Sequence, residues 1–116
     1  MQIQRVLVCG GRDYDDRGRL WLVLDGLADE YPGQWAVVAG GAPGADRLAV
    51  TWAHECGRVS VEFRADWAQH GRAAGPIRNQ AMADYGADLV VAFPGGRGTR
   101  DMTRRARRAG VPVRQG

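Results

Sequence analysis

The sequence predicts an α/β fold, a three-layer αβα sandwich around a five-stranded, mostly parallel sheet. Short apolar runs alternate with longer segments whose apolar residues recur every three or four positions, and three of the runs end in glycine-rich turns. Such strict alternation implies parallel strands joined by right-handed crossovers, with helices covering both faces of the sheet. We therefore expect one Rossmann-like domain over residues 1–116.

Five short apolar segments are the predicted strands, over residues 3–9, 35–39, 59–63, 88–93 and 111–113. Four segments with helical spacing separate them, and the last is expected over residues 98–109. The residues predicted to face the sheet are Leu20, Leu24 and Leu27, then Ala45, Leu48, Ala49, Trp52 and Ala53, then Ile77, Ala81, Met82 and Tyr85, and finally Met102, Ala106 and Ala109.

Composition is that of an ordinary globular protein. The chain has 116 residues, 45% of them hydrophobic and 25% charged. No apolar run approaches the roughly 20 residues needed to span a membrane, and no signal-peptide core precedes the first strand, so we expect a cytoplasmic protein without membrane contact. Cys9 and Cys56 lack zinc or redox spacing, which predicts reduced thiols, no metal and no cofactor.

All basic residues of the chain are arginines. The formal net charge is +3 and the 16 basic residues include no lysine. This bias has two explanations, a GC-rich coding sequence or a need for forked donors to phosphate and carboxylate groups. Composition does not separate them.

Glycine-rich turns follow the first, second and fourth predicted strands, at residues 10–13, 40–46 and 94–99. Because the carboxyl ends of parallel strands share one edge, these turns should converge around a ligand. Glycine lets a ligand approach the backbone, and a helix that begins there offers free amides to an anion. One such turn alone would indicate only a tight connection, but three favour a binding site. The chain has neither a Walker A motif nor a dinucleotide fingerprint.

The residues that we expect to bind the ligand are Gly10, Gly11, Arg12, Asp13, Gly41, Ala42, Gly44, Asp46, Arg78, Asn79, Pro94, Gly95, Gly96, Arg97, Gly98 and Thr99.

Four motifs, at residues 9–14, 40–46, 74–80 and 93–99, resemble the SLOG superfamily, which groups the LOG phosphoribohydrolases with the DNA-processing protein DprA. The resemblance covers nearly the whole chain and is greatest to the YspA-type branch of small bacterial and phage proteins. It implies a Rossmann-like fold and a nucleotide or nucleotide-derived ligand against the loop of residues 94–99.

The same resemblance bears on catalysis. In LOG enzymes this loop is followed by a catalytic glutamate, whose place here is taken by Met102, while Arg78 resembles their upstream catalytic arginine. Glycosidic cleavage needs a carboxylate, which a thioether cannot replace. Adjacent helix positions differ by about 100° in direction, so Asp101 cannot simply replace a carboxylate at position 102. Asp13 or Asp46 could supply the carboxylate from another loop. Arg78 and Asp13 are thus the candidate catalytic residues, although LOG-type hydrolysis is doubtful.

Several candidates have a structural alternative. Arg12 and Asp13 either contact the ligand or pair with each other on the surface. Asp46 either contacts the ligand or stabilises the start of a helix, and Asn79 and Thr99 either bind the ligand or cap helices. Arg78 opposes the dipole at the start of its helix, which a bound anion would compensate.

Aromatic and histidine side chains have similar alternatives. Trp67 and His70, on the predicted loop after the third strand, either stack on a base and close the pocket or pack on the domain. His54 is expected to face solvent, and Trp21, Trp35 and Trp52 are expected in the core or an interface.

Three functions follow from these features. The leading hypothesis is a module that senses, carries or sequesters a nucleotide-type small molecule. We expect it to form a homodimer or higher oligomer, by analogy with related Rossmann-like proteins. The second is a nucleotide or NAD-derivative hydrolase. The third is DprA-like binding of single-stranded DNA by an arginine-rich last helix, although a solvated helix face explains these arginines more simply: Arg104, Arg105, Arg107 and Arg108.

Overall fold

The computed structural model describes residues 2–116 and contains a five-stranded sheet in which all neighbouring strands are parallel. The strands are β1 (Arg5–Cys9), β2 (Ala36–Ala39), β3 (Ser60–Glu62), β4 (Leu89–Ala92) and β5 (Val113–Gln115), in the order β3-β2-β1-β4-β5. The predicted α/β fold with five strands is confirmed.

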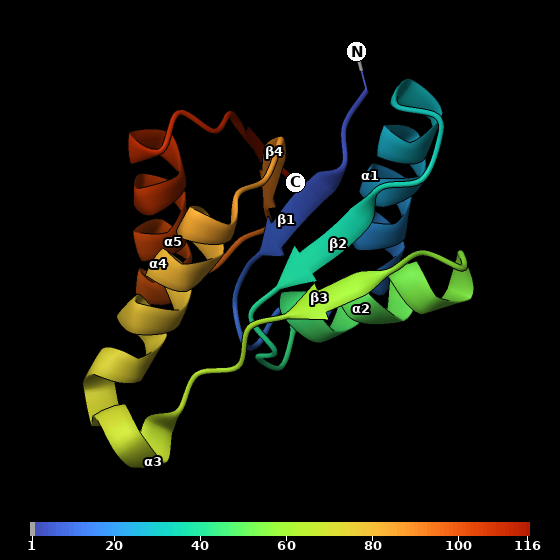
Figure 1. The fold of residues 1–116 in the computed structure, drawn as a ribbon. Coiled ribbons are helices and arrows are strands. Elements are labelled where there is room, and N and C mark those ends of the chain that lie inside the picture. The colour runs from blue at the N-terminus through green and yellow to red at the C-terminus, as the bar shows by residue number, and fades with distance from the viewer. Residues whose placement is uncertain (1) are drawn as a thin grey trace.

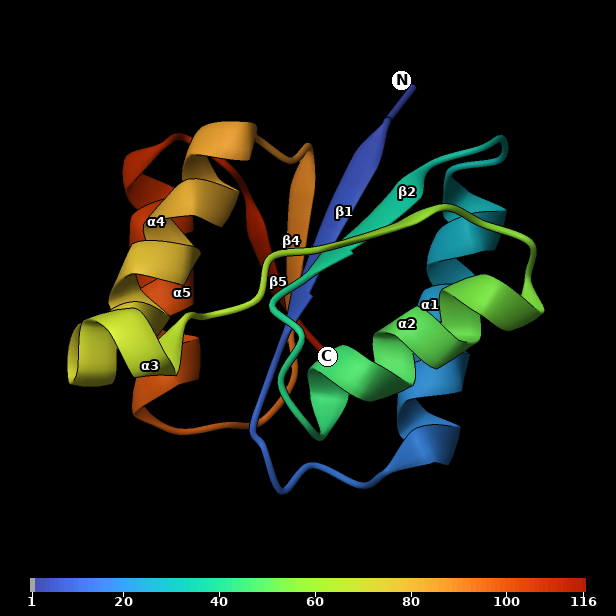
Figure 2. The same cartoon turned by 60° about the horizontal axis from the view of Figure 1, so that its bottom comes forward.

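Helices cover both faces of the sheet, as Figures 1 and 2 show. One face carries α1 (Arg17–Glu30) and α2 (Ala45–Glu55), and the other carries α4 (Ala74–Tyr85) and α5 (Arg97–Arg108). The short helix α3 (Trp67–His70) and the 3₁₀ turn η1 (Gly71–Ala73) lead into α4. None of the helices within residues 2–116 has the length and apolar content to cross a membrane.

The core has two halves because successive side chains of a strand point to opposite faces. Val6 and Val8 of β1 pack in the cluster beneath α1 and α2. Leu7 and Cys9 pack in the cluster beneath α4 and α5, together with Met102. The central strand β1 is therefore buried on both sides, as its continuous apolar run predicts.

The strand order reverses between β1 and β4. From β1 the chain builds outward through β2 to β3, and it then crosses to β4 and β5 on the other side of β1. Cys9 at the end of β1 lies opposite Ala92 at the end of β4. In open α/β sheets, ligands bind at the carboxyl ends of the strands beside such a reversal, and the first and third glycine-rich turns begin there.

The predicted inward face of the third helix is wrong in part. Ile77 and Tyr85 on α4 are 48% and 39% exposed, and Ala81 is exposed as well. Met82 is buried as predicted, and the buried face of α4 also contains Asn79, which was not predicted to face inward. Asn79 on this face forms hydrogen bonds with Gly98 and Asp101 of α5. Polar contacts with α5, rather than apolar residues alone, therefore decide which face of α4 is buried.

Element boundaries also differ from the predictions. Val59 is 67% exposed and precedes β3, which pairs only with β2 at the sheet edge. Strand β5 begins two residues later than expected, because the Val111 amide still bonds the Ala106 carbonyl of α5 at 3.0 Å. Ala109 is exposed beyond the end of α5. Trp67 and His70 form α3 rather than a loop.

Candidate functional site

The three glycine-rich turns meet at the carboxyl edge of the sheet, as predicted. The Gly11 amide donates to the Pro94 carbonyl at 2.9 Å, which joins the first turn to the third. The Ala45 amide donates to the Gly11 carbonyl at 3.3 Å, which joins the second turn to the first. The reversal of strand order between β1 and β4 explains the first contact, since it makes their following turns neighbours.

Two glycines make this approach possible. A Cβ on Gly95 would lie 2.6 Å from the Gly11 nitrogen, and a Cβ on Gly44 would lie 2.2 Å from the Gly11 oxygen. Gly44 also has a φ of 81°, a left-handed conformation that side chains other than glycine disfavour. Any larger residue at either position would push the turns apart.

A cavity of about 1080 Å³ opens where the turns meet. Most predicted ligand-binding residues line it: Gly10, Gly11, Arg12, Asp13, Ala42, Asp46, Arg78, Asn79, Pro94, Gly95, Gly96, Arg97, Gly98 and Thr99. Gly41 lines a smaller, neighbouring cavity. Gly44 lines neither, and its close contact with the first turn gives it a structural role.

The start of α5 presents free backbone amides to the large cavity. Gly96 is the N-cap of this helix, and no side chain caps it. The first backbone amide that bonds within the helix is that of Arg100, which donates to the Gly96 carbonyl. The amides of residues 97–99 therefore have no helical acceptor, and all three residues line the cavity. Thr99 lies inside the helix, so its interpretation as an N-cap is wrong.

The start of α2, by contrast, is partly tied into the fold. The Ala45 amide bonds Gly11, and the Asp46 carboxylate accepts hydrogen bonds from the amides of Gly40 and Ala42 at 3.1 and 3.2 Å. Burial raises the pKa of Asp46 to about 6, despite these hydrogen bonds and the positive charge of Arg78. Asp46 thus fixes the second turn, and the first amide of α2 is not free for a ligand.

Arg78 reaches from α4 to the second turn. Its Nη1 donates to the Gly40 carbonyl and its Nε donates to the Asn79 side chain at 3.0 Å. Within residues 2–116 its Nη2 has no hydrogen-bond partner, although Arg78 lines the cavity. Burial lowers the pKa of Arg78, while the charge of Asp46 opposes that shift. The guanidinium is therefore held in place with one nitrogen available.

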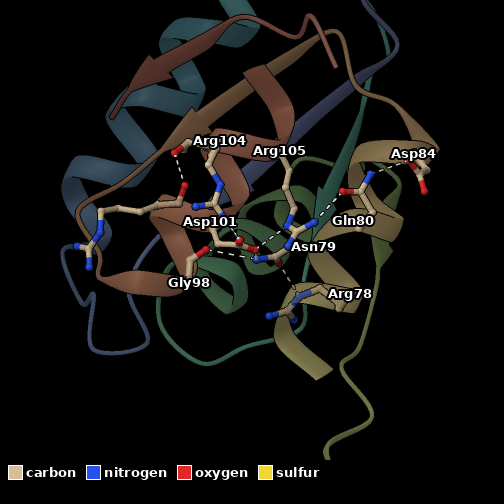
Figure 3. Close-up of polar contacts among 10 residues, drawn as sticks. Arg78, Asn79, Gln80, Asp84, Gly98, Asp101, Arg104 and Arg105 are labelled. Carbon is tan, nitrogen blue, oxygen red and sulfur yellow. Dashed lines mark hydrogen bonds and ion pairs between the residues drawn. The ribbon is translucent and has the colours of Figure 1, made fainter. Parts of the chain in front are cut away.

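Asn79 connects Arg78 to the turn after β4, as Figure 3 shows. Its side-chain nitrogen donates to the Gly98 carbonyl at 3.3 Å and to the Asp101 carboxylate at 3.0 Å. Asp101 also pairs with Arg104 at 2.6 Å and with Arg105 at 2.8 Å. Burial would raise the pKa of Asp101, but hydrogen bonds from Arg105 and Asn79 and the charges of Arg105 and Arg104 hold it below its usual value.

Neither position near the LOG glutamate offers a free carboxylate. Asp101 accepts hydrogen bonds on both oxygens. Met102 is only 1% exposed and packs in the core between α5 and the sheet. Position 102, to which the sequence resemblance assigned the LOG glutamate, thus faces the core.

The first glycine-rich turn adds two charged side chains to the cavity. Arg12 and Asp13 line the cavity but form no ion pair with each other in the described part of the chain, so that alternative is wrong. The sequence did not single out Tyr14 and Arg72 as binding residues, yet both line the cavity. The buried Tyr14 hydroxyl has no hydrogen-bond partner among residues 2–116. Tyr14 directly follows Arg12 and Asp13 in the sequence, and this position beside two predicted binding residues could have identified it.

The remaining predictions concern side chains away from the turns. His54 is exposed, as expected, and both Trp35 and Trp52 are buried. Cys9 and Cys56 are free thiols, as expected. Arg104, Arg107 and Arg108 are exposed, as a solvated helix face predicts, whereas Arg105 is half-buried, and both Arg104 and Arg105 pair with Asp101.

Comparison with known families agrees with this geometry. The YAcAr family, described as the YspA, cpYpsA-related SLOG family, matches residues 4–70. The chain belongs to this SLOG family. It is also 46% identical over 121 residues to the Gene 61 protein of Mycobacterium phage D29, an alignment that spans 96% of this chain and 94% of the phage protein. No solved structure gives a significant match.

The two comparisons cover different parts of the site. The SLOG family match includes the first two glycine-rich turns, whereas Arg78 and the turn of residues 94–99 lie beyond it. The likeness to the phage protein extends over nearly the whole chain. SLOG membership suggests a role in binding a nucleotide-related ligand, which agrees with the resemblance found in the sequence.

Proposed function

We propose that this protein binds a nucleotide or nucleotide-derived small molecule, with a phosphate group against the first turn of α5. The observation that carries the proposal is the set of free amides at residues 97–99, which line a cavity together with Arg78. Free amides and the positive end of a helix dipole favour an anion, and arginine adds charge-assisted hydrogen bonds. The cavity volume of about 1080 Å³ is ample for a nucleotide.

A sensor, carrier or sequestering module fits this site better than a hydrolase. Asp46 and Asp101 both accept hydrogen bonds within the domain, and Met102 is in the core. DprA-like DNA binding has less support, because Arg104 and Arg105 are engaged with Asp101.

Calorimetric titration with mono-, di- and cyclic nucleotides, NAD and ADP-ribose tests the binding proposal. At least one should bind, and Arg78→Ala should weaken it by about tenfold or more, because a charge-assisted hydrogen bond is lost. Arg47→Ala is the matched control, since Arg47 is exposed on α2 and lines neither cavity. Absence of binding by every compound would overturn the proposal.

Hydrolysis is the second candidate, favoured by one observation. Asp13 lines the cavity, and its carboxylate has no hydrogen-bond partner in the described part of the chain. A free carboxylate at this edge could activate water. Chromatography of products after long incubation with each bound nucleotide distinguishes the two functions. Turnover that disappears in Asp13→Asn would establish the hydrolase and replace the binding module.

Self-association stays a prediction, tested by sedimentation of the purified chain. The exposed Ile77 of α4 gives a specific site to perturb. If the chain is a dimer through this helix, Ile77→Asp should shift it to monomer.

A further inference from the structure

A second, smaller cavity adjoins the first. Its volume is about 200 Å³ and its floor is the glycine-rich turn of residues 40–43. Arg12, Arg64 and Arg78 line it, and no aspartate or glutamate among residues 2–116 does so. The nearest carboxylates are those of Glu62, which approaches Arg64, and of Asp46, which bonds the amides of Gly40 and Ala42. Three guanidinium groups against these two carboxylates leave an excess of positive charge, which favours an anion.

The two cavities share part of their walls. Arg12, Ala42, Trp67 and Arg78 line both. Arg78 is fixed by hydrogen bonds of Nε and Nη1, and its Nη2 has no partner within the described residues. A guanidinium held at this boundary can contact a ligand that extends from one cavity into the other.

Trp67 provides an aromatic surface at the same boundary. It begins α3, whose start is fixed by a 3.0 Å hydrogen bond from the Gln69 amide to Asp66. Its indole lies beside Gly75, where an added Cβ would be 3.3 Å from Trp67 Cη2. Trp67 nevertheless remains 50% exposed. An indole that is positioned by neighbours and half open suits stacking on a nucleobase.

Arg64 is available for a ligand in the small cavity. It approaches Glu62 at 3.5 Å, but its side chain is 76% exposed. An exposed pair of this kind contributes little free energy, so a phosphate can replace it at low cost. Arg64 does not line the large cavity. Substitution of Arg64 should therefore weaken binding only of ligands that place a group in the small cavity.

We propose that the ligand is a nucleotide derivative with two separate phosphate groups, one at the start of α5 and the other between Arg12, Arg64 and Arg78. Its base stacks on Trp67, where the cavities join. The chemistry is that of a nucleoside 3′,5′-bisphosphate or a cyclic dinucleotide. This inference rests on the proposed function, because it assumes that a nucleotide occupies the large cavity.

The experiment compares adenosine 5′-monophosphate with adenosine 3′,5′-bisphosphate and cyclic di-AMP by calorimetric titration of the full chain. At least one of the two doubly phosphorylated probes should bind about tenfold or more tightly than the monophosphate. Arg64→Ala should reduce this preference to about one, whereas the exposed control Arg47→Ala should keep it. Trp67→Ala should weaken the preferred probe by about fivefold or more, and Trp67→Phe should retain most of the affinity.

The outcomes separate this inference from the proposed function. If the monophosphate binds and both other probes bind no more tightly, or if Arg64→Ala keeps the preference, the second phosphate site is wrong and nucleotide binding still stands. If no probe and no compound of the wider panel binds, the proposed function itself fails. Thermal unfolding of each variant establishes that it is folded, which the exposure of Arg64 and Trp67 leads us to expect.

Discussion

The side-chain amide of Asn79 donates a hydrogen bond of 3.3 Å to the carbonyl oxygen of Gly98, which ties α4 to the first turn of α5. The same side chain accepts a 3.0 Å hydrogen bond from Arg78. Asn79 is only 4% exposed. The arginine and the free amides at the start of α5 are thus held in a fixed relation by one buried amide group, and the first prediction concerns its loss.

Asn79→Ala should lower the free energy of unfolding by about 2 kcal/mol, because it removes three part-buried hydrogen bonds and leaves Nε of Arg78 without a partner. Chemical denaturation measures this change. Gln69→Ala is the control: Gln69 is exposed and its side chain has no hydrogen-bond partner among residues 2–116, so its substitution should change stability by no more than about 0.5 kcal/mol. Equal effects of both substitutions would contradict the role given to Asn79.

Asp46 should make stability depend on pH between about 4 and 6. Burial raises its pKa from 3.8 to about 6 in the folded chain. The folded state therefore holds this proton to higher pH than the unfolded state, and its contribution to stability is full below pH 3.8 and is lost as pH rises through 6. As pH rises through this range, the free energy of unfolding of Asp46→Asn should increase relative to that of the wild type by on the order of 2 kcal/mol.

Asp101 should make stability depend on pH in the opposite direction to Asp46. Its pKa is lowered despite partial burial, through hydrogen bonds from Arg105 and Asn79, so its contribution to stability is present above its unfolded pKa and is lost as pH falls. Denaturation series at several pH values should show Asp101→Asn most destabilised near neutrality. If the stability of Asp46→Asn and of Asp101→Asn, each relative to the wild type, changes with pH in the same direction, both pKa assignments are contradicted.

Gly44→Ala should destabilise the fold by about 2 kcal/mol or more, because Gly44 has a φ of 81° and its added Cβ would lie 2.2 Å from the Gly11 carbonyl. Gly26 in α1 is the matched control, since an added Cβ there meets nothing within 4 Å. Gly26→Ala should stabilise the protein by about 0.5–1 kcal/mol through its helical preference. Thermal unfolding compares the two, and a stable Gly44→Ala would show that the turns tolerate separation.

Met102→Glu should fail to create a hydrolase. Met102 is 1% exposed in the core, so a glutamate there would bury a carboxylate without a partner and lower stability by several kcal/mol. Met102→Leu keeps the volume and should cost under about 1.5 kcal/mol. Product chromatography and denaturation check both variants. Release of a ribose phosphate by a folded Met102→Glu protein would mean that position 102 can reach the cavity.

Helix α4 explains why sequence patterns locate helices better than their buried faces. Its apolar residues Ile77, Ala81 and Tyr85 share one face, and apolar spacing alone assigned that face to the core. The buried face instead contains Asn79, because this amide finds its partners on α5, which a local pattern cannot include. The opposite case is α1, where Leu20, Leu24 and Leu27 are buried as their spacing predicts.

The sequence by itself determined the alternation of strands and helices, the glycine-rich turns and their place at the carboxyl edge, because these depend on local periodicity and on the conformational freedom of glycine. Only the tertiary structure decided which groups remain free there. The Ala45 amide at the start of α2 bonds Gly11, and Asp46 fixes the turn before that helix. Met102 faces the core, and Arg64 lines the second cavity. These outcomes depend on contacts between segments far apart in the chain, which no local pattern encodes.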